Sequence, residues 1–277
     1  MTGKYLNITI FFDDIQKKEI VNALIVSELT ILGIEDQDDC LNLYMREEDF
    51  DEALFKNIVD INIINYSIST INDINWNEEW EKNFEPVLIG NFVSILADFH
   101  EKIPGVEYEI LITPKMSFGT GHHATTHMMV TMMREYNCAG RTVLDFGTGT
   151  GILAILAEKM GATSVTAIDN DDWSMDNALE NIERNRCSKI RLVKADQFVT
   201  DSPVQFILAN INRNVILDNM SAIASGVEEN GTVLFSGILT EDLNEIEQSA
   251  AANKLVKLQA VEKNNWVCAA FKRTGRG

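Results

Sequence analysis

A short apolar strand followed by three closely spaced glycines constrains the fold of this 277-residue chain more than any other feature. The segment reads as a strand, a tight turn and the start of a helix: Val143-Leu144-Asp145-Phe146-Gly147-Thr148-Gly149-Thr150-Gly151. Glycines allow the sharp turn and let a ligand approach the backbone without meeting a Cβ atom. Asp169 ends the next strand, where a carboxylate can accept hydrogen bonds from two ribose hydroxyls. Together these features predict a site for a nucleotide-like cofactor.

The spacing of the glycines narrows the choice of cofactor. The pattern is G-x-G-x-G, whereas dinucleotide enzymes carry G-x-G-x-x-G. Asp145 also lies two residues before the first glycine, where it would repel a pyrophosphate but attract the cationic amino acid end of S-adenosylmethionine. The turn therefore predicts an S-adenosylmethionine-dependent methyltransferase. The leading alternative is a nicotinamide-dependent oxidoreductase, which also uses a glycine turn and a ribose-binding acid.

From residue 142 onward, strand and helix signals alternate, which is typical of a doubly wound α/β domain with a mostly parallel sheet. Three helices are expected here: one from the glycine turn to Met160, one that contains Met175, Ala178, Leu179 and Ile182, and one over 241–251. The tail predicts two strands that turn at Lys263-Asn264-Asn265, which would add an antiparallel strand to the sheet. The strands are expected at 87–97, 108–112, 142–146, 164–168, 190–193, 205–209, 233–236 and, for the final hairpin, within 255–271.

A smaller α/β unit precedes this domain. Strands are expected at 6–12, 40–45 and 61–71, with one helix that ends near Gly33 and another over 49–59. Trp76, Trp80 and Phe84 then recur at helical spacing, which predicts a linker helix that Pro86 ends. The predicted domains are 1–72 for substrate recognition, 73–86 for the linker helix and 87–277 for catalysis.

Composition argues against a nucleic-acid-binding protein and against a membrane protein. The net charge of −19 disfavours a dedicated nucleic-acid binder, since phosphate contacts require Lys and Arg. The charge is uneven: residues 1–85 have a net charge of −13 and residues 86–277 one of −6. Solubility explains such acidity, and attraction of a basic partner is the alternative. No apolar run approaches ~18 residues and no signal peptide is evident, so we expect a cytoplasmic protein that does not bind membranes.

Histidine and cysteine patterns predict no metal site. The four cysteines are far apart and form no C-x-x-C pair, as expected of reduced thiols. His123 and His127 are four residues apart, but the rest of an H-E-x-x-H pattern is missing. The methionines at 128, 129, 132 and 133 are interpreted as core residues of a helix.

Two further segments carry polar groups near the predicted cofactor site. Residues 114–126 contain two glycines and several hydroxyls just before a helix, which suits a loop that wraps a ligand. Residues 206–212 form an apolar strand that ends in polar residues, where open α/β sheets bind ligands. Asn210 there could orient an amine through its side-chain carbonyl or simply form a turn.

These motifs resemble the ribosomal protein L-eleven methyltransferases, a family of class I protein methyltransferases that use S-adenosylmethionine. Order and spacing match over 113–240, and residues 80–92 resemble the linker and first catalytic strands, whereas residues 1–72 match only in size and α/β character. The resemblance rests on Ser117-Phe118-Gly119-Thr120-Gly121-His122-His123-Ala124-Thr125-Thr126, the glycine turn, Ala167-Ile168-Asp169, Ala209-Asn210-Ile211 and Ser236-Gly237-Ile238-Leu239.

The resemblance implies a seven-stranded Rossmann-like sheet, a ferredoxin-like N-terminal domain and ribosomal protein L-eleven as the substrate, gripped by that N-terminal domain. Departures from the family pattern are Ala124 in place of Pro or Glu, Thr148 in place of Cys, and a short N-terminal domain. The first two are expected to alter loop stiffness more than chemistry. The implied cofactor-contacting positions are Thr126, Gly147, Asp169 and Asn210, with Phe118 and Gly149 close by, in addition to Asp145.

The implied reaction is direct displacement, in which an amine nitrogen attacks the sulfonium methyl group and S-adenosylhomocysteine leaves. The acceptor would be a lysine side-chain or N-terminal amine. We expect the carbonyls at Asn210 and Ile211 to hold that amine, and no dedicated base is evident. A non-catalytic module that binds a ribosomal protein is the alternative from another class.

Overall fold

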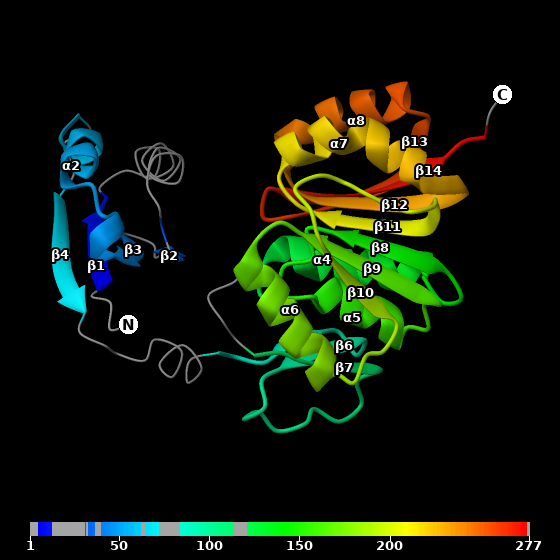
Figure 1. Ribbon diagram of the computed structural model, residues 1–277, viewed down its shortest axis with the longest axis horizontal. Helices are drawn as coiled ribbons and strands as arrows, with labels where there is room; N and C mark the ends of the chain where they lie inside the picture. The colour runs from blue at the N-terminus through cyan, green and yellow to red at the C-terminus, as the bar shows by residue number, and fades with distance from the viewer. Residues whose placement is uncertain are drawn as a thin grey trace. The chain divides into compact units, whose positions relative to one another are not determined.

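The computed structural model describes residues 5–12, 31, 33–36, 40–61, 65–71, 84–113 and 121–275. The chain divides into two compact units, residues 1–79 and 80–277, and each is described here by itself. Figure 1 shows the elements of both units. Among the described residues, no helix is both long and apolar enough to cross a membrane.

The first unit contains a four-stranded antiparallel sheet in the order β2-β3-β1-β4, the strand order of a ferredoxin-like fold. Alternate residues of the central strands are buried, as expected for a sheet with one covered face. They pack with Phe55 of the helix α2. The elements are β1 (Tyr5–Phe11), β2 (Gly33–Asp36), β3 (Cys40–Arg46), the 3-10 helix η1 (Glu47–Asp49), α2 (Glu52–Ile61) and β4 (Asn65–Ile71).

Several expectations for this region need correction. Gly33 does not simply end a helix, because it begins the strand β2, which was not predicted. The last strand starts at Asn65 rather than at Ile61, since α2 extends to Ile61. The first expected helix lies almost wholly outside the described residues. The same holds for the linker helix, of which only 84–86 are described, so the domain limits stay predictions.

The second unit is built on a seven-stranded sheet in the order β10-β9-β8-β11-β12-β14-β13. The first five strands in that order run parallel, and β14 is antiparallel to both β12 and β13. This confirms the doubly wound, mostly parallel Rossmann-like sheet that the sequence predicts. The strands are β8 (Thr142–Phe146), β9 (Ser164–Asp169), β10 (Ile190–Lys194), β11 (Val204–Asn210), β12 (Val227–Leu239), β13 (Leu255–Lys263) and β14 (Trp266–Arg273).

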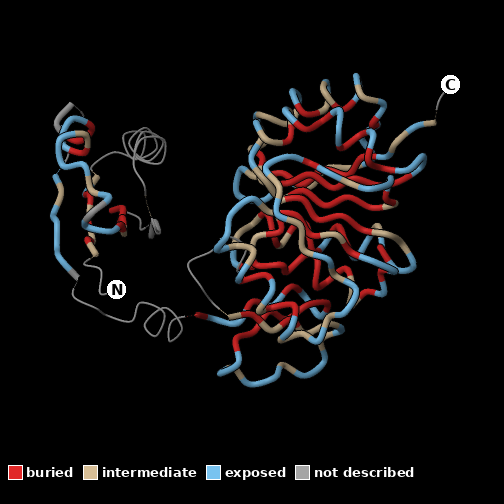
Figure 2. The backbone as a smooth tube through the Cα atoms, in the orientation of Figure 1, coloured by how far each residue is buried: buried red, intermediate tan, exposed pale blue. Residues whose placement is uncertain are grey.

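Two separate cores cover the two faces of this sheet, because successive strand residues point to opposite faces. Val143 packs in one core with residues of α4 and α5, and Leu144 packs in the other with residues of α7 and α8. Figure 2 shows the central strands as the buried part of the unit. The four methionines of α4 are buried, which confirms them as core residues. The helices are α4 (Ala124–Tyr136), α5 (Ile152–Lys159), α6 (Asp172–Arg184), α7 (Arg213–Gly226) and α8 (Leu243–Ala252), with the 3-10 helix η2 (Thr240–Asp242) before α8.

Three details of the second unit differ from expectation. Residues 87–97 form a hairpin of β5 (Val87–Ile89) and β6 (Val93–Leu96) instead of one strand, and Gly90 adopts a positive φ of 57° at the turn. With β7 (Tyr108–Leu111) they make a separate three-stranded sheet. Helix α7 was not predicted, and Leu179 is exposed rather than part of the apolar stripe of α6.

Candidate functional site

The order of the strands brings the predicted site residues together at the carboxyl ends of the central strands. Strand β8 lies between β9 and β11, and all three run parallel. Phe146 pairs with Ile168 of β9 and with Ala209 of β11, so Gly147, Asp169 and Asn210 follow at the same level. Polar groups at the carboxyl ends of adjacent parallel strands can converge on one ligand.

The glycine turn is held tightly to β9. Gly147, Gly149 and Gly151 have φ values of 77°, 53° and 81°, a region that L side chains rarely adopt. The backbone N–H groups of Gly147 and Thr148 both donate to the Ile168 carbonyl, at 2.8 and 2.9 Å. The Gly149 N–H donates to Asp169 Oδ2 at 2.8 Å. The glycine turn therefore holds the predicted ribose-binding carboxylate, that of Asp169, in place.

Asp145 is a fully buried acid beneath this turn. The Thr148 hydroxyl donates to its Oδ2 at 2.6 Å, while its Oδ1 has no hydrogen-bond partner among the described residues. Burial raises the pKa of Asp145 from 3.8 to about 7. The Thr148 hydrogen bond offsets part of the rise, the negative charge of Asp169 adds to it, and the backbone N–H of Ala154 lowers it slightly without making a hydrogen bond of normal geometry to Oδ1. A cation near Oδ1 would relieve this cost. Sequence reasoning assigned Thr148 to loop stiffness and missed its contact with the carboxyl group.

Ile211 lies directly against the glycine turn. A Cβ atom at Gly147 would meet Ile211 Cγ2 at 2.1 Å, so that space is already filled. On its other side, Ile211 contacts Gly237, which has a φ of 80°. A Cβ atom added at Gly237 would lie 2.5 Å from the Ile211 carbonyl oxygen. The Ile211 N–H donates to the Ser236 carbonyl at 3.1 Å. Glycine at 237 thus leaves the space beside the Ile211 carbonyl open.

Asn210 has a buried carbonyl oxygen with no partner among the described residues. Its Nδ2 faces the Thr126 hydroxyl of α4 at 3.5 Å, at the limit of a hydrogen bond. The local turn is instead stabilised by Asn212, whose Oδ1 accepts from the Val215 N–H at the start of α7. The side-chain contact that stabilises this turn thus comes from Asn212, and Asn210 Oδ1 makes no hydrogen bond among the described residues.

His123, the first of the two histidines at 123 and 127, has structural partners. His123 caps α4 by accepting from the Thr125 N–H, and its ring packs edge-on against Trp266, with 4.9 Å between ring centres. Burial lowers the pKa of both His123 and His127. Within the described part of the chain, no cluster of three metal-ligating side chains occurs. Phe118 lies outside the described residues.

One further group near the site was not identified from the sequence. Asn181 of α6 is fully buried and its Nδ2 donates to the carbonyl of Thr150 in the glycine turn, at 2.8 Å. The signal was present, because Asn177, Asn181 and Asn185 recur every four residues on a predicted helix.

Comparisons with known proteins extend the resemblance to nearly the whole chain. A family model described as ribosomal protein L11 methyltransferase (PrmA) matches residues 8–274. A ribosomal protein L11 methyltransferase of Phocaeicola vulgatus is 38% identical over 279 residues, which cover 97% of this chain and 99% of that protein. One of Porphyromonas gingivalis is 44% identical over 209 residues, 74% of this chain and 72% of that protein. The crystal structure of a ribosomal protein L11 methylase from Lactobacillus delbrueckii subsp. bulgaricus has a TM-score of 0.65 and 31% identity, over 69% of this chain and 100% of that chain.

Proposed function

We propose that S-adenosylmethionine is the methyl donor of this chain. The chain belongs to the ribosomal protein L11 methyltransferase family and is therefore a methyltransferase. We further propose that the acceptors are lysine side-chain and/or N-terminal amines of ribosomal protein L11. The observation that supports this most is a pair of buried oxygen atoms beside the glycine turn, Asp145 Oδ1 and Asn210 Oδ1, which have no hydrogen-bond partner among the described residues. Both suit a nitrogen that donates hydrogen bonds.

The residues present fit this cofactor. Asp145 would hold the cationic amino group, since the attraction of an ammonium beside a buried carboxylate offsets part of the cost of its burial. Asp169 would accept from the ribose hydroxyls with the lone pairs that its two backbone partners, Gly149 and Asp171, leave free. When bound, S-adenosylmethionine supplies an already activated methyl group.

The chain's own residues would then align the acceptor. Asn210 Oδ1 and the Ile211 carbonyl would accept hydrogen bonds from the amine and direct its lone pair. Only the neutral amine is nucleophilic, and a free lysine amine has a pKa near ~10.4. Removal from water lowers that value, so a dry pocket assists the loss of the proton. Alignment and desolvation are the main contributions expected from the protein.

The acidic bias of the chain supports a basic protein substrate. Residues 1–85 have a net charge of −13, and ribosomal proteins are mostly basic. Opposite charges speed the encounter of two proteins and orient them, more than they add affinity. The N-terminal unit is therefore the proposed docking site for ribosomal protein L11.

One experiment tests the whole proposal. The protein is incubated with labelled S-adenosylmethionine and unmethylated ribosomal proteins, and modified residues are mapped by mass spectrometry. We expect label on amines of ribosomal protein L11. Absence of label on every ribosomal protein would favour a binding module instead. In calorimetry, binding of NAD without binding of S-adenosylhomocysteine would favour an oxidoreductase.

A single substitution tests the role of Asn210. With saturating cofactor, Asn210→Ala should reduce turnover roughly tenfold to a hundredfold, because an amine would lose one hydrogen-bond acceptor in a buried site. Asn212→Ser is the matched control, since it keeps a capping oxygen for α7 two residues away. Full turnover in Asn210→Ala would exclude the proposed role.

A further inference from the structure

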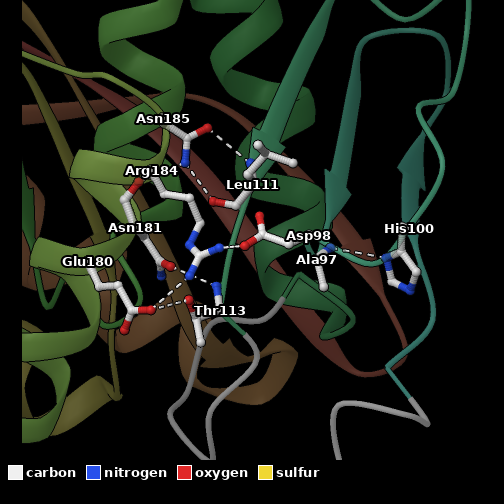
Figure 3. A network of polar contacts seen from close by, with 9 residues as sticks. All are labelled: Ala97, Asp98, His100, Leu111, Thr113, Glu180, Asn181, Arg184 and Asn185. Atoms are coloured by element: carbon white, nitrogen blue, oxygen red, sulfur yellow. Dashed lines mark hydrogen bonds and ion pairs between the residues drawn. The ribbon is translucent and has the colours of Figure 1, made fainter.

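Two asparagine side chains, from Asn181 in α6 and from Asn185 directly after it, bond to the backbone of β7 and of the residues that follow it (Figure 3). Asn185 donates to the Leu111 carbonyl at 2.6 Å and accepts from the Leu111 N–H at 3.0 Å. Asn181 Oδ1 accepts from the Thr113 N–H at 2.8 Å. The opposite edge of β7 pairs with β6. The two amides therefore continue the hydrogen-bond ladder along the edge that β6 leaves uncovered.

Asn181 differs from Asn185 because it also reaches the glycine turn. Its Nδ2 donates to the Thr150 carbonyl at 2.8 Å and to Asn177 Oδ1 at 3.2 Å. The neighbouring Gly149 N–H donates to Asp169 Oδ2. Two peptide groups of the turn, Thr148–Gly149 and Thr150–Gly151, are thus held by two side chains, one from the end of β9 and one from α6.

The other partner of Asn181, Thr113, precedes the site residue Thr126 along the chain. Thr113 is the last described residue before the segment that continues to Gly121 and then to α4, which carries Thr126. Thr113 is held a second time, because its hydroxyl donates to Glu180 at 2.6 Å. Glu180 in turn pairs with Arg184, which also pairs with Asp98 (Figure 3).

We propose that Asn181 is a positioning residue for cofactor binding: one buried amide sets the glycine turn against Thr113, which precedes Thr126 along the chain. The proposal rests on the proposed cofactor. Asn181 is fully buried, so loss of its amide would leave the Thr150 carbonyl and the Thr113 N–H without that partner. The expected effect is on cofactor affinity rather than on turnover at saturation.

Asn181→Asp gives the sharpest test, because the two side chains have the same shape. One carboxylate oxygen can still accept from Thr113, but the other would face the oxygens of Thr150 and Asn177. Protonation at low pH would restore a donor at that position. Asn185→Asp is the matched control, since it disturbs the β7 edge in the same way without touching the turn.

The readout is the dissociation constant for S-adenosylhomocysteine, measured by calorimetry at pH 5.5 and 8.5 and divided by the wild-type value at each pH. Asn181→Asp should weaken binding about tenfold or more at pH 8.5, the effect of one buried unsatisfied group, and recover most of it at pH 5.5. Asn185→Asp should bind within about twofold of wild type at both. In assays, the KM for the cofactor should rise while kcat at saturation stays constant.

Wild-type affinity in folded Asn181→Asp at pH 8.5 would overturn the proposal, as would equal weakening in both variants. If Asn181→Asp does not fold at pH 8.5, Asn181→Ser replaces it, and wild-type affinity in that variant has the same meaning. Failure of the wild-type protein to bind S-adenosylhomocysteine would instead contradict the proposed cofactor. The two failures are therefore distinguishable.

Discussion

Replacing Asp145 with Asn should make the protein more stable and, at the same time, weaker in binding cofactor. The Asp145 carboxyl is fully buried, one of its oxygens has no partner among the described residues, and its pKa is raised from 3.8 to about 7. A raised pKa in the folded state means that stability is fully present below pH ~4 and is lost as pH rises toward 7. The amide of Asn carries no charge, so it avoids this loss.

The size of the effect follows from the pKa difference. Roughly three pKa units correspond to about 4 kcal/mol of stability, at about 1.4 kcal/mol per unit. Between pH 5.5 and 8.5 the unfolded carboxyl stays ionised while the folded one loses its proton. The free energy of unfolding of Asp145→Asn, relative to wild type, should therefore rise by about 2 kcal/mol over that range. The Thr148 hydroxyl can still donate to the Asn side-chain oxygen.

The assay is urea unfolding of both proteins at pH 5.5 and 8.5, without added cofactor, followed by circular dichroism. All other titrating groups are shared, so the change in the difference between the two proteins reports Asp145 alone. A difference that stays constant, or that shrinks as pH rises, would falsify the idea that burial of this carboxyl is uncompensated.

Binding provides the second half of this prediction. S-adenosylhomocysteine keeps the cationic amino acid end, so its affinity at pH 8.5 should fall about tenfold to a hundredfold in Asp145→Asn, the range expected for a lost charge-assisted hydrogen bond. Calorimetry measures this directly. Unchanged affinity, together with the expected gain in stability, would show that the carboxyl does not meet the amino group.

Two further predictions concern groups that support the site. His123→Ala should lower stability by about 1 kcal/mol through loss of the α4 cap, whereas His123→Asn should keep it; equal losses in thermal melts would contradict the capping role. Because burial lowers the pKa of His123, the contribution of this cap should disappear as pH falls below the unfolded value of 6.5. Gly237→Ala should lower the free energy of unfolding by about 1–3 kcal/mol and reduce kcat, since the added Cβ would press on the Ile211 carbonyl. Gly90→Ala is also strained, but its Cβ would lie in open space, so it should lower stability less and leave kcat unchanged. Equal kcat in the two glycine variants, compared by steady-state assay, would mean that Ile211 tolerates displacement.

The sequence predicted the parallel core of the fold well, because buried strands appear as compact apolar runs between turn residues. Strand β8 has the predicted limits, and the final hairpin turns where predicted, with Asn264 and Asn265 at φ values of 52° and 62°. The edge strand β2 could not be read from Gly-Ile-Glu-Asp, because its pairing with β3 forms it. Helix α7 was missed although Ile216, Met220 and Ile223 recur at helical spacing, since polar and small residues lie between them.

The site was predictable as a set of strand ends but not as a set of contacts. Each candidate carboxylate or amide follows an apolar run, which indicates position along the chain and little else. Whether Thr148 faces Asp145, or whether Asn181 reaches the glycine turn, depends on distances that only the packed structure defines. Periodicity alone could have drawn attention to Asn181, but could not have named its two partners.

Contacts around Ile211 join the cofactor side of the site to its acceptor side. Ile211 Cγ2 occupies the space where Gly147 would carry a Cβ, and its backbone is held by Ser236 and pressed close to Gly237. Any shift of the glycine turn must therefore move Ile211, and Asn210 with it. In the proposed reaction the methyl donor and the amine would then be aligned by core packing, which changes little with time, rather than by a flexible loop. Such alignment explains how a site with no assigned base could still promote transfer: the amine needs only to arrive neutral and correctly oriented, because the donor is already activated.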